Sequence, residues 1–118
     1  MIAPIEDLAD GVVAMSATGQ FTIDDYTKVV EPELDAVADR HEQVRLFLYL
    51  GPQFAGFGDG AWGELTGEIR HTKFHRGAVV TDDHEIRGAL NLLKWMLHGD
   101  VRTFQNHEYD KAAAWVAR

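Results

Sequence analysis

The sequence has no cysteine, a single serine and no apolar run long enough to cross a membrane. The absence of cysteine excludes disulfides, thiol catalysis and cysteine–zinc sites. A membrane-spanning helix needs about 20 consecutive apolar residues, and the segment after Met1 lacks the basic and apolar regions of a secretion signal. We therefore expect a soluble cytoplasmic protein without stable membrane insertion.

Basic residues are also scarce, because 11 Lys and Arg stand against 19 Asp and Glu, a formal net charge of −8. Nucleic-acid binding requires a basic surface, and so does docking on an anionic membrane. The composition disfavours both. With 118 residues, the chain is expected to form one domain covering residues 1–118, since domains commonly have about 100–150 residues.

The most informative stretch is VRLFLYLGPQFAGF, residues 44–57. Apolar side chains occupy both parities of residues 44–50, which is typical of a central strand covered on both faces in a parallel sheet. Gly51 and Pro52 are expected to end this strand, because proline lacks an N–H and glycine adopts unusual backbone angles.

Aromatic residues follow the expected end of this strand: Phe54, Phe57 and then Trp62. Open α/β sheets bind ligands beyond the carboxyl ends of their strands, so this loop is the first candidate site. Residues 59–71 then predict a helix weakened by its glycines. Two interpretations stay open, either a mobile lid or close packing on the sheet, for the glycines Gly60, Gly63 and Gly67.

The remaining pattern alternates between strands and helices. Further strands are expected at residues 2–8, 12–17, 77–81 and 101–105, and helices at 22–41, 84–98 and 108–117. This order favours an α/β fold with a single, mainly parallel five-stranded sheet and crossover helices. An Asp-Gly pair predicts an antiparallel hairpin between the first two strands.

Local signals mark the ends of the helices. Thr22 begins a capping-box-like segment, and Pro32 predicts a kink or restart within the first helix. Residues 82–83 are expected to cap the helix after the fourth strand. Gly99 suits the C-terminal end of that helix, and Asn106 is expected to cap the last one.

The helix expected at residues 84–98 has an apolar face wider than one sheet requires. Leu92 and Trp95 extend that face, while the polar residues are confined to a narrow sector. Such a surplus indicates a second neighbour, which is either the C-terminal helix or the partner in a homodimer. The polar residues of the narrow sector are Arg87, Asn91, Lys94 and His98.

Taken together, these segments resemble the SpoIIAA-like family of the STAS and CRAL-TRIO fold group. The resemblance covers nearly the whole chain. Its segments are GVVAMSATGQFTIDDY at 11–26, the step formed by Glu31-Pro32 and Leu34, VRLFLYL at 44–50, KFHRGAVVTDD at 73–83, VRTFQ at 101–105 and YDKAAAWV at 109–116.

The resemblance implies two possible roles. One is that of a STAS-type regulatory module, which in anti-sigma-factor antagonists uses a phosphorylatable serine near the start of the helix after the central strand. Residues 51–62 contain no Ser or Thr, and Thr66 lies later in the helix. The other is CRAL-TRIO-like carriage of an apolar molecule, for which the walls would be Phe54, Phe57, Trp62, Leu92 and Trp95.

Metal-binding and anion-binding patterns are weak. His71 and His75 are four residues apart, a spacing compatible with a metal site on one helix face. They are instead expected near the turn into a strand, and no HExxH pattern is present, so we expect no metal. With Lys73 and Arg76 they form a basic patch, which either contacts an anionic group or an acidic partner or is an ordinary solvated loop.

Catalytic motifs are absent from the sequence. Ser16 lies in an expected strand without a nucleophile elbow, and the glycine-rich residues 56–60 lack the Lys-Ser/Thr of a phosphate loop. We expect no enzymatic activity and no cofactor. A cleft that brought His71 or His75 close to Asp82 would reopen the question.

The function that these patterns favour is a STAS-like binding or regulatory module acting through protein–protein contact or self-association. The motivation is the over-wide apolar helix together with the lack of a catalytic set. The alternative is a carrier of a small apolar or lipid-like ligand, held between the aromatic residues and the helix that bears Trp95.

Overall fold

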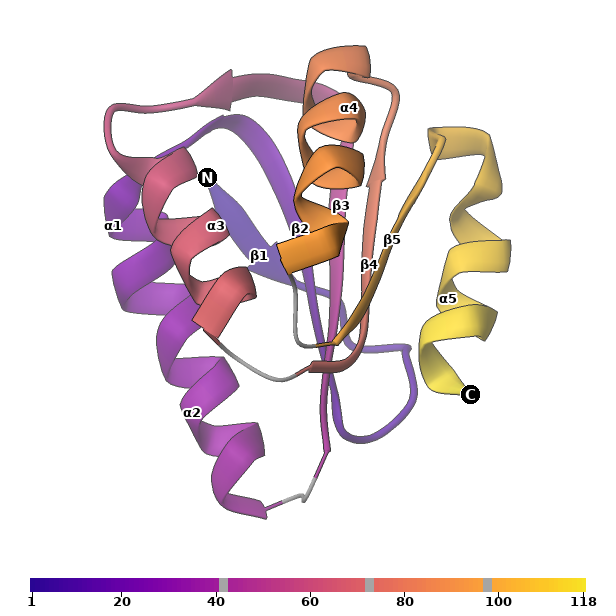
Figure 1. Ribbon diagram of the computed structural model, residues 1–118. Coiled ribbons are helices and arrows are strands. Elements are labelled where there is room, and N and C mark those ends of the chain that lie inside the picture. The colour runs from indigo at the N-terminus through magenta and orange to yellow at the C-terminus, as the bar shows by residue number, and fades with distance from the viewer. Residues whose placement is uncertain (41–42, 72–73, 97–98) are drawn as a thin grey trace.

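A five-stranded sheet forms the centre of the molecule, with strand order β1-β2-β3-β4-β5 (Figure 1). The computed structural model describes residues 1–40, 43–71, 74–96 and 99–118, without the side chain of Trp95. β1 pairs antiparallel with β2, and the other neighbours are parallel, which confirms the predicted sheet. The strands are β1 (Ile2–Pro4), β2 (Val12–Phe21), β3 (Val44–Phe57), β4 (Phe74–Thr81) and β5 (Asp100–Phe104).

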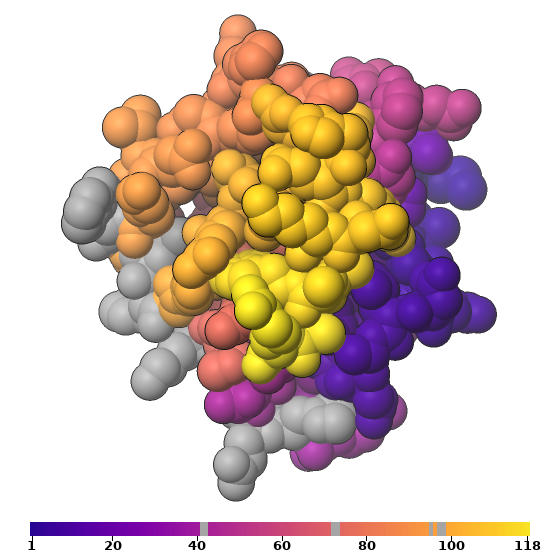
Figure 2. All heavy atoms as spheres, turned by 90° about the vertical axis from the view of Figure 1, so that its right-hand side faces the viewer, coloured from indigo at the N-terminus to yellow at the C-terminus, as the bar shows by residue number. Residues whose placement is uncertain are grey.

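The helices are divided unequally between the two faces of the sheet. The connections from β2 to β3, from β3 to β4 and from β4 to β5 each lead to the adjacent strand, always in the same direction across the sheet. Right-handed crossovers of this kind place their helices on the same face. That face is covered by α1 (Ile23–Asp25), the π-helix η1 (Tyr26–Val30), α2 (Glu31–Arg40), α3 (Ala61–His71) and α4 (His84–Leu93). The opposite face is covered by α5 (Tyr109–Ala117), in yellow toward the viewer in Figure 2.

The first half of β3 is buried on both faces, as its two-sided apolar pattern predicts. Leu46, Leu48 and Leu50 belong to the larger core beneath α2, α3 and α4. Phe47 belongs to the smaller core beneath α5, together with Trp115. Alternate residues of one strand therefore supply both cores.

The expected end of this strand at Gly51 and Pro52 is wrong, because β3 continues to Phe57. The extension pairs with β2, which itself continues to Phe21, four residues beyond its expected end. β4 has already ended opposite Leu50, so this part of β3 has a neighbour on one side only. Proline is tolerated in an edge position of that kind.

The first helical segment begins and changes geometry close to the expected positions. The Thr22 Oγ1 accepts the Asp25 N–H at 3.1 Å, and an Asp25 carboxylate oxygen accepts the Thr22 N–H at 2.9 Å, which confirms the capping box. The π-helix Tyr26–Val30 then precedes Pro32, which lies in the first turn of α2. The Glu31 N–H donates to the Tyr26 carbonyl in the π-helix, so the missing N–H of Pro32 falls where the helical hydrogen bonding changes its spacing.

The later helices differ from expectation at their ends. The Asp83 Oδ1 caps α4 by accepting the N–H groups of Glu85 and Ile86, but α4 ends at Leu93 and a 3-10 turn, η2 (Lys94–Met96), follows. The predicted Asn106 cap is wrong. The Glu108 carboxylate instead accepts the Gln105 N–H in the 3-10 turn η3 (Asn106–Glu108) that precedes α5.

Candidate functional site

Three of the predicted aromatic residues gather where β3 passes into α3. The ring centroids of Phe54 and Phe57 are 5.2 Å apart, and those of Phe57 and Trp62 are 5.0 Å apart. Phe21 adds a fourth ring, 5.3 Å from Phe57. All three pairs are tilted or edge-to-face, the arrangements that aromatic quadrupoles favour. The predicted aromatic residues therefore form one continuous cluster.

A tight turn brings Trp62 back over Phe57. The Gly58 N–H donates to the Phe21 carbonyl at 2.8 Å, so the end of β3 stays attached to β2. Gly60 then has a φ of +79°, a conformation that side-chain-bearing residues rarely adopt. The Ala61 N–H donates back to the Gly58 carbonyl at 3.1 Å, and α3 begins there.

The cluster borders a cleft of about 260 Å³. Its opposite wall is the first part of α4, which supplies Ile86 and Ala89 with Glu85 at the side. We call this the aromatic cleft, and its lining residues are Phe57, Trp62, Glu85, Ile86 and Ala89. The volume is slightly below the roughly 300–1,000 Å³ usual for small-molecule sites, so it suits one side chain or one small ring.

The structure places Leu92 outside the aromatic cleft but on the same flank of α4. At 100° per residue, Glu85, Ala89 and Leu92 lie within about 60° of one another around the helix. The Leu92 side chain is 78% exposed, and Met96 in the following turn is 53% exposed. We call Glu85, Ala89, Leu92 and Met96 the cleft flank of α4. This flank continues the wall of the cleft as an exposed apolar surface.

Within the predicted basic patch, the structure places Arg76 on the other face of β4 from its neighbour His75. His71, at the end of α3, and His75, on β4, are exposed, and Lys73 lies outside the described residues. Arg76 points to the opposite face of the sheet, where it donates to the Trp115 carbonyl at 2.7 Å and lies 5.0 Å from the Trp115 ring centroid. Arg76 thus contributes to holding α5, since cations favour helix C-termini.

A second pocket, of about 300 Å³, lies at the carboxyl ends of β3 and β4. Phe54 and Pro52 form its apolar side, and Asp82 and Asp83 its acidic side. Both carboxylates already accept backbone N–H groups, Asp83 at the start of α4 and Asp82 from Asn106 at 2.8 Å. Backbone hydrogen bonds therefore account for both carboxylates, and of the two only Asp83 caps α4.

Among the described residues, the candidate catalytic side chains do not come together. β4 separates His75 from Asp82 by seven residues, about 23 Å of strand, so these groups do not meet.

Other polar groups are engaged in the fold. The Thr66 hydroxyl donates to the Trp62 carbonyl at 2.8 Å. Burial, followed by the hydrogen bond to Glu68, raises the pKa of the Tyr26 phenol, which lies in the core beneath α3. Within the described ranges no three His, Asp or Glu side chains are placed to hold a metal ion.

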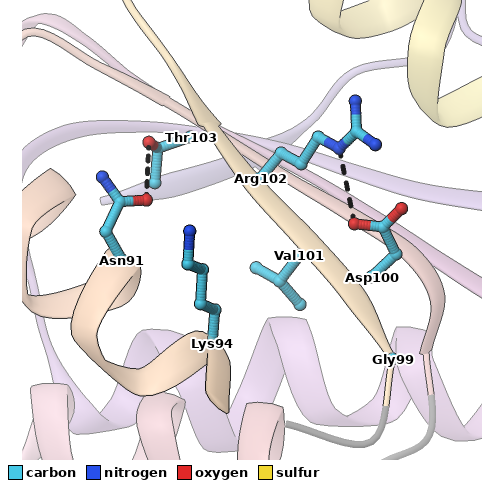
Figure 3. Close-up of a pocket in the computed structure, with 7 residues that line it drawn as sticks. All are labelled: Asn91, Lys94, Gly99, Asp100, Val101, Arg102 and Thr103. Carbon is cyan, nitrogen blue, oxygen red and sulfur yellow. Dashed lines mark hydrogen bonds and ion pairs between the residues drawn. The ribbon is translucent and has the colours of Figure 1, made fainter.

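A further cavity is one that the sequence patterns did not predict. It has a volume of about 610 Å³ and lies between α4 and the outermost strand β5 (Figure 3). We call it the edge groove. Asn91 and Lys94 stand on one side and residues 99–103 on the other. The sequence held one indication of this groove, the spacing of Arg87, Asn91 and Lys94, which places their side chains on one flank of the helix.

These features define a mixed α/β domain with surface grooves on both sides of α4 and no catalytic group in the part that the structure describes. The chain belongs to the SpoIIAA-like family, whose model matches residues 12–117. Membership of this family is consistent with a STAS-like regulatory module. No helix among the described residues is long and apolar enough to cross a membrane.

A solved structure has a fold similar to that of this chain. It is the crystal structure of an uncharacterized protein with a SpoIIAA-like fold from Shewanella loihica PV-4, with a TM-score of 0.72. The two sequences are 21% identical, and the match covers 98% of this chain and 93% of the other. At that identity the likeness shows the fold alone. No curated protein matches the chain.

Proposed function

We propose that this protein is a non-enzymatic, STAS-like regulatory module that binds a partner protein through the aromatic cleft and the cleft flank of α4. The observation that carries this proposal is the 78% exposure of Leu92 on a helix flank that leads directly into the cleft. Large apolar side chains grouped beside an aromatic groove are typical of protein-binding surfaces.

The free energy available from this surface is sufficient for a regulatory contact. Fully burying one large apolar side chain contributes about 1.5–3 kcal/mol. Leu92 and Met96 are both available for such burial, and Trp62, which is half-buried, adds a rigid aromatic contact. A partner that inserted an apolar side chain between Phe57 and Ala89 would bury all three residues together.

Site-specific photocrosslinking in the source cells tests the proposal. A photoreactive phenylalanine at position 92 is expected to give a discrete crosslinked species. The same group at position 114, an exposed alanine on α5, is the matched control and is expected to give none. Trp62→Ala should lower the yield at position 92 at least fivefold, while thermal unfolding confirms that the variant is folded.

The outcomes of this experiment separate the possible partners. A species of twice the chain mass would identify the partner as a second copy of the protein. A heterologous species would identify a regulatory partner. Equal yields at positions 92 and 114, or none at position 92, would contradict partner binding at this surface.

A second candidate function is transport of a small apolar ligand in the aromatic cleft. It is favoured by the edge-to-face pair of Phe54 with Phe57 and the tilted pair of Phe57 with Trp62, which offer an aromatic wall. The cleft of about 260 Å³ admits a ring-sized molecule but not a lipid chain. Native mass spectrometry of the purified protein should then show a bound mass that Trp62→Ala removes, and a spectrum of bare protein would argue against transport.

A further inference from the structure

The two edges of the sheet are protected to different degrees. The outer strand β1 has three residues and includes Pro4, and short strands with proline discourage pairing with another chain. β5, at the other edge, has five residues and no proline. Its register with β4 runs without a shift from Asp100 to Phe104. Among the described residues no strand pairs with the outer side of β5.

The edge groove runs alongside this open strand. Figure 3 shows Asn91 and Lys94 projecting from α4 and its following turn toward β5. The Thr103 hydroxyl and the Asn91 side-chain oxygen are 3.5 Å apart, so strand and helix are in contact at this point. The cavity of about 610 Å³ leaves room beside the strand for the side chains of an added segment.

The described lining of the groove has two cationic side chains, Lys94 and Arg102, against one carboxylate, a local excess of one positive charge in a protein with a net charge of −8. Lys94 lies on the α4 side of β5, and Arg102 points to the other face of the sheet, where it lies 4.8 Å from the Trp115 ring centroid. Asp100 is acidic and also lines the groove, and its carboxylate pairs with Arg102 at 3.4 Å.

Arg87 adds a further positive charge to the helix flank. The Arg87 Nε is buried and has no hydrogen-bond partner, while its Nη2 lies 2.8 Å from the His84 ring nitrogen. Arg87, Asn91 and Lys94 are spaced by four and three residues, so they lie on one side of the helix, and the last two line the groove. We call these three residues the edge flank of α4.

We propose that β5 accepts an extended, acidic segment of a partner protein as a sixth strand of the sheet. Main-chain hydrogen bonds to the open edge would supply affinity, and the charges would supply specificity. Successive side chains of a strand point to opposite faces. A segment with consecutive acidic residues would therefore place one toward Lys94 and the next toward Arg102.

This inference rests on the proposed function as a protein-binding module, but it uses the opposite flank of α4. The two surfaces can therefore fail separately. The edge flank makes no contribution to the lining of the aromatic cleft, and the cleft residues do not line the edge groove.

Selection from a random ten-residue peptide library displayed on phage tests the inference. Enriched peptides are expected to contain at least two consecutive Asp or Glu residues. Their binding should slow amide hydrogen exchange at residues 100–104. Lys94→Glu should weaken binding at least tenfold, whereas Lys28→Glu, which reverses a cation on η1 that pairs with Asp24, should change it less than twofold.

Backbone methylation of the selected peptide separates strand addition from simple charge attraction. N-methyl groups at alternate residues remove hydrogen-bond donors and keep the charge, so strand addition predicts at least a tenfold loss of affinity. Unchanged affinity would overturn the inference. So would an absence of enriched peptides, or protection of residues 100–104 by self-association without peptide.

One further outcome concerns the proposed function. Enriched apolar peptides that lose binding in Trp62→Ala and keep it in Lys94→Glu would overturn the edge-strand inference. They would at the same time support the aromatic cleft as the partner site. If position 92 gave no crosslink while acidic peptides bound along β5, the aromatic cleft would be overturned as the partner site. The edge-strand inference would then be supported.

Discussion

The two flanks of α4 differ in chemistry although both run along the same short helix and the 3-10 turn that follows it. The cleft flank presents Ala89 and Leu92 to the aromatic cleft and to solvent, whereas the edge flank presents Asn91 and Lys94 to the open strand β5. Ile86 and Leu90 lie between the flanks and are buried on the sheet. A helix at the margin of a sheet has one buried side, so both of its flanks remain available for contacts.

The difference between the flanks indicates two kinds of recognition. An apolar groove beside exposed Leu92 favours insertion of side chains, and affinity there follows the apolar area buried. A charged groove beside an open strand favours main-chain pairing, and affinity there falls with salt concentration. Changes that affect one flank and spare the other therefore measure how independent the two surfaces are.

The largest effect is expected for Gly99→Ala on the edge side. A Cβ at this position would collide with the Phe74 carbonyl oxygen, because the chain passes close to the start of β4. We expect a loss of about 3 kcal/mol in the free energy of unfolding, in line with overpacked sites, and a marked fall in the melting temperature. Chemical denaturation measures this loss.

Gly88→Ala is the matched control for that change. A Cβ at Gly88 meets no atom within 4 Å, and alanine favours a helix interior over glycine by about 1 kcal/mol. The control should therefore stabilise the protein. Equal destabilisation by both substitutions would show that the close approach at Gly99 is not the cause.

A smaller effect is expected for Asp83→Ala, which acts on both flanks together. The Asp83 Oδ1 accepts two N–H groups at the start of α4, and loss of such a cap costs about 1 kcal/mol. Amide exchange should accelerate along the whole of α4. Asp35→Ala, at an exposed position of α2, should leave the exchange of α4 unchanged, and faster exchange on one flank alone would contradict a shared cap.

The smallest effect is expected on the cleft side, for Gly63→Ala and Gly67→Ala in α3. A Cβ at either position meets nothing within 4 Å, so each alanine should stabilise the protein by about 0.5–1 kcal/mol. Differential scanning calorimetry of the single and double variants measures this gain. A loss of stability would show that these positions need glycine for packing.

The glycines of α3 also show where sequence reasoning reached its limit. Close packing on the sheet was one expected reason for them, and it is wrong for Gly63 and Gly67, which have open space beside them. Gly60 differs, because its φ of +79° forms the turn that places Trp62 over Phe57. Spacing along the chain does not distinguish these roles, since it carries no information on neighbouring atoms.

The central strand shows the same limit in another form. The two-sided apolar pattern of residues 44–50 predicted burial on both faces, and the structure confirms it. Gly51 and Pro52 predicted a strand end, but pairing between Phe57 and Phe21 continues the strand beyond them. A local signal for termination was overcome by hydrogen bonding to a strand 30 or more residues earlier in the chain.

Local chemistry along the chain was enough to predict the α/β class, the capping box at Thr22, the cap at Asp83 and the two-sided core strand, because each depends on neighbouring residues or on periodicity. The aromatic candidates Phe54, Phe57 and Trp62 were also recognised in this way. The edge groove, the exposure of Leu92 and the attachment of Arg76 to α5 depended on strand order and on the face that each helix covers. Those features arise from contacts between distant segments, which periodicity does not specify.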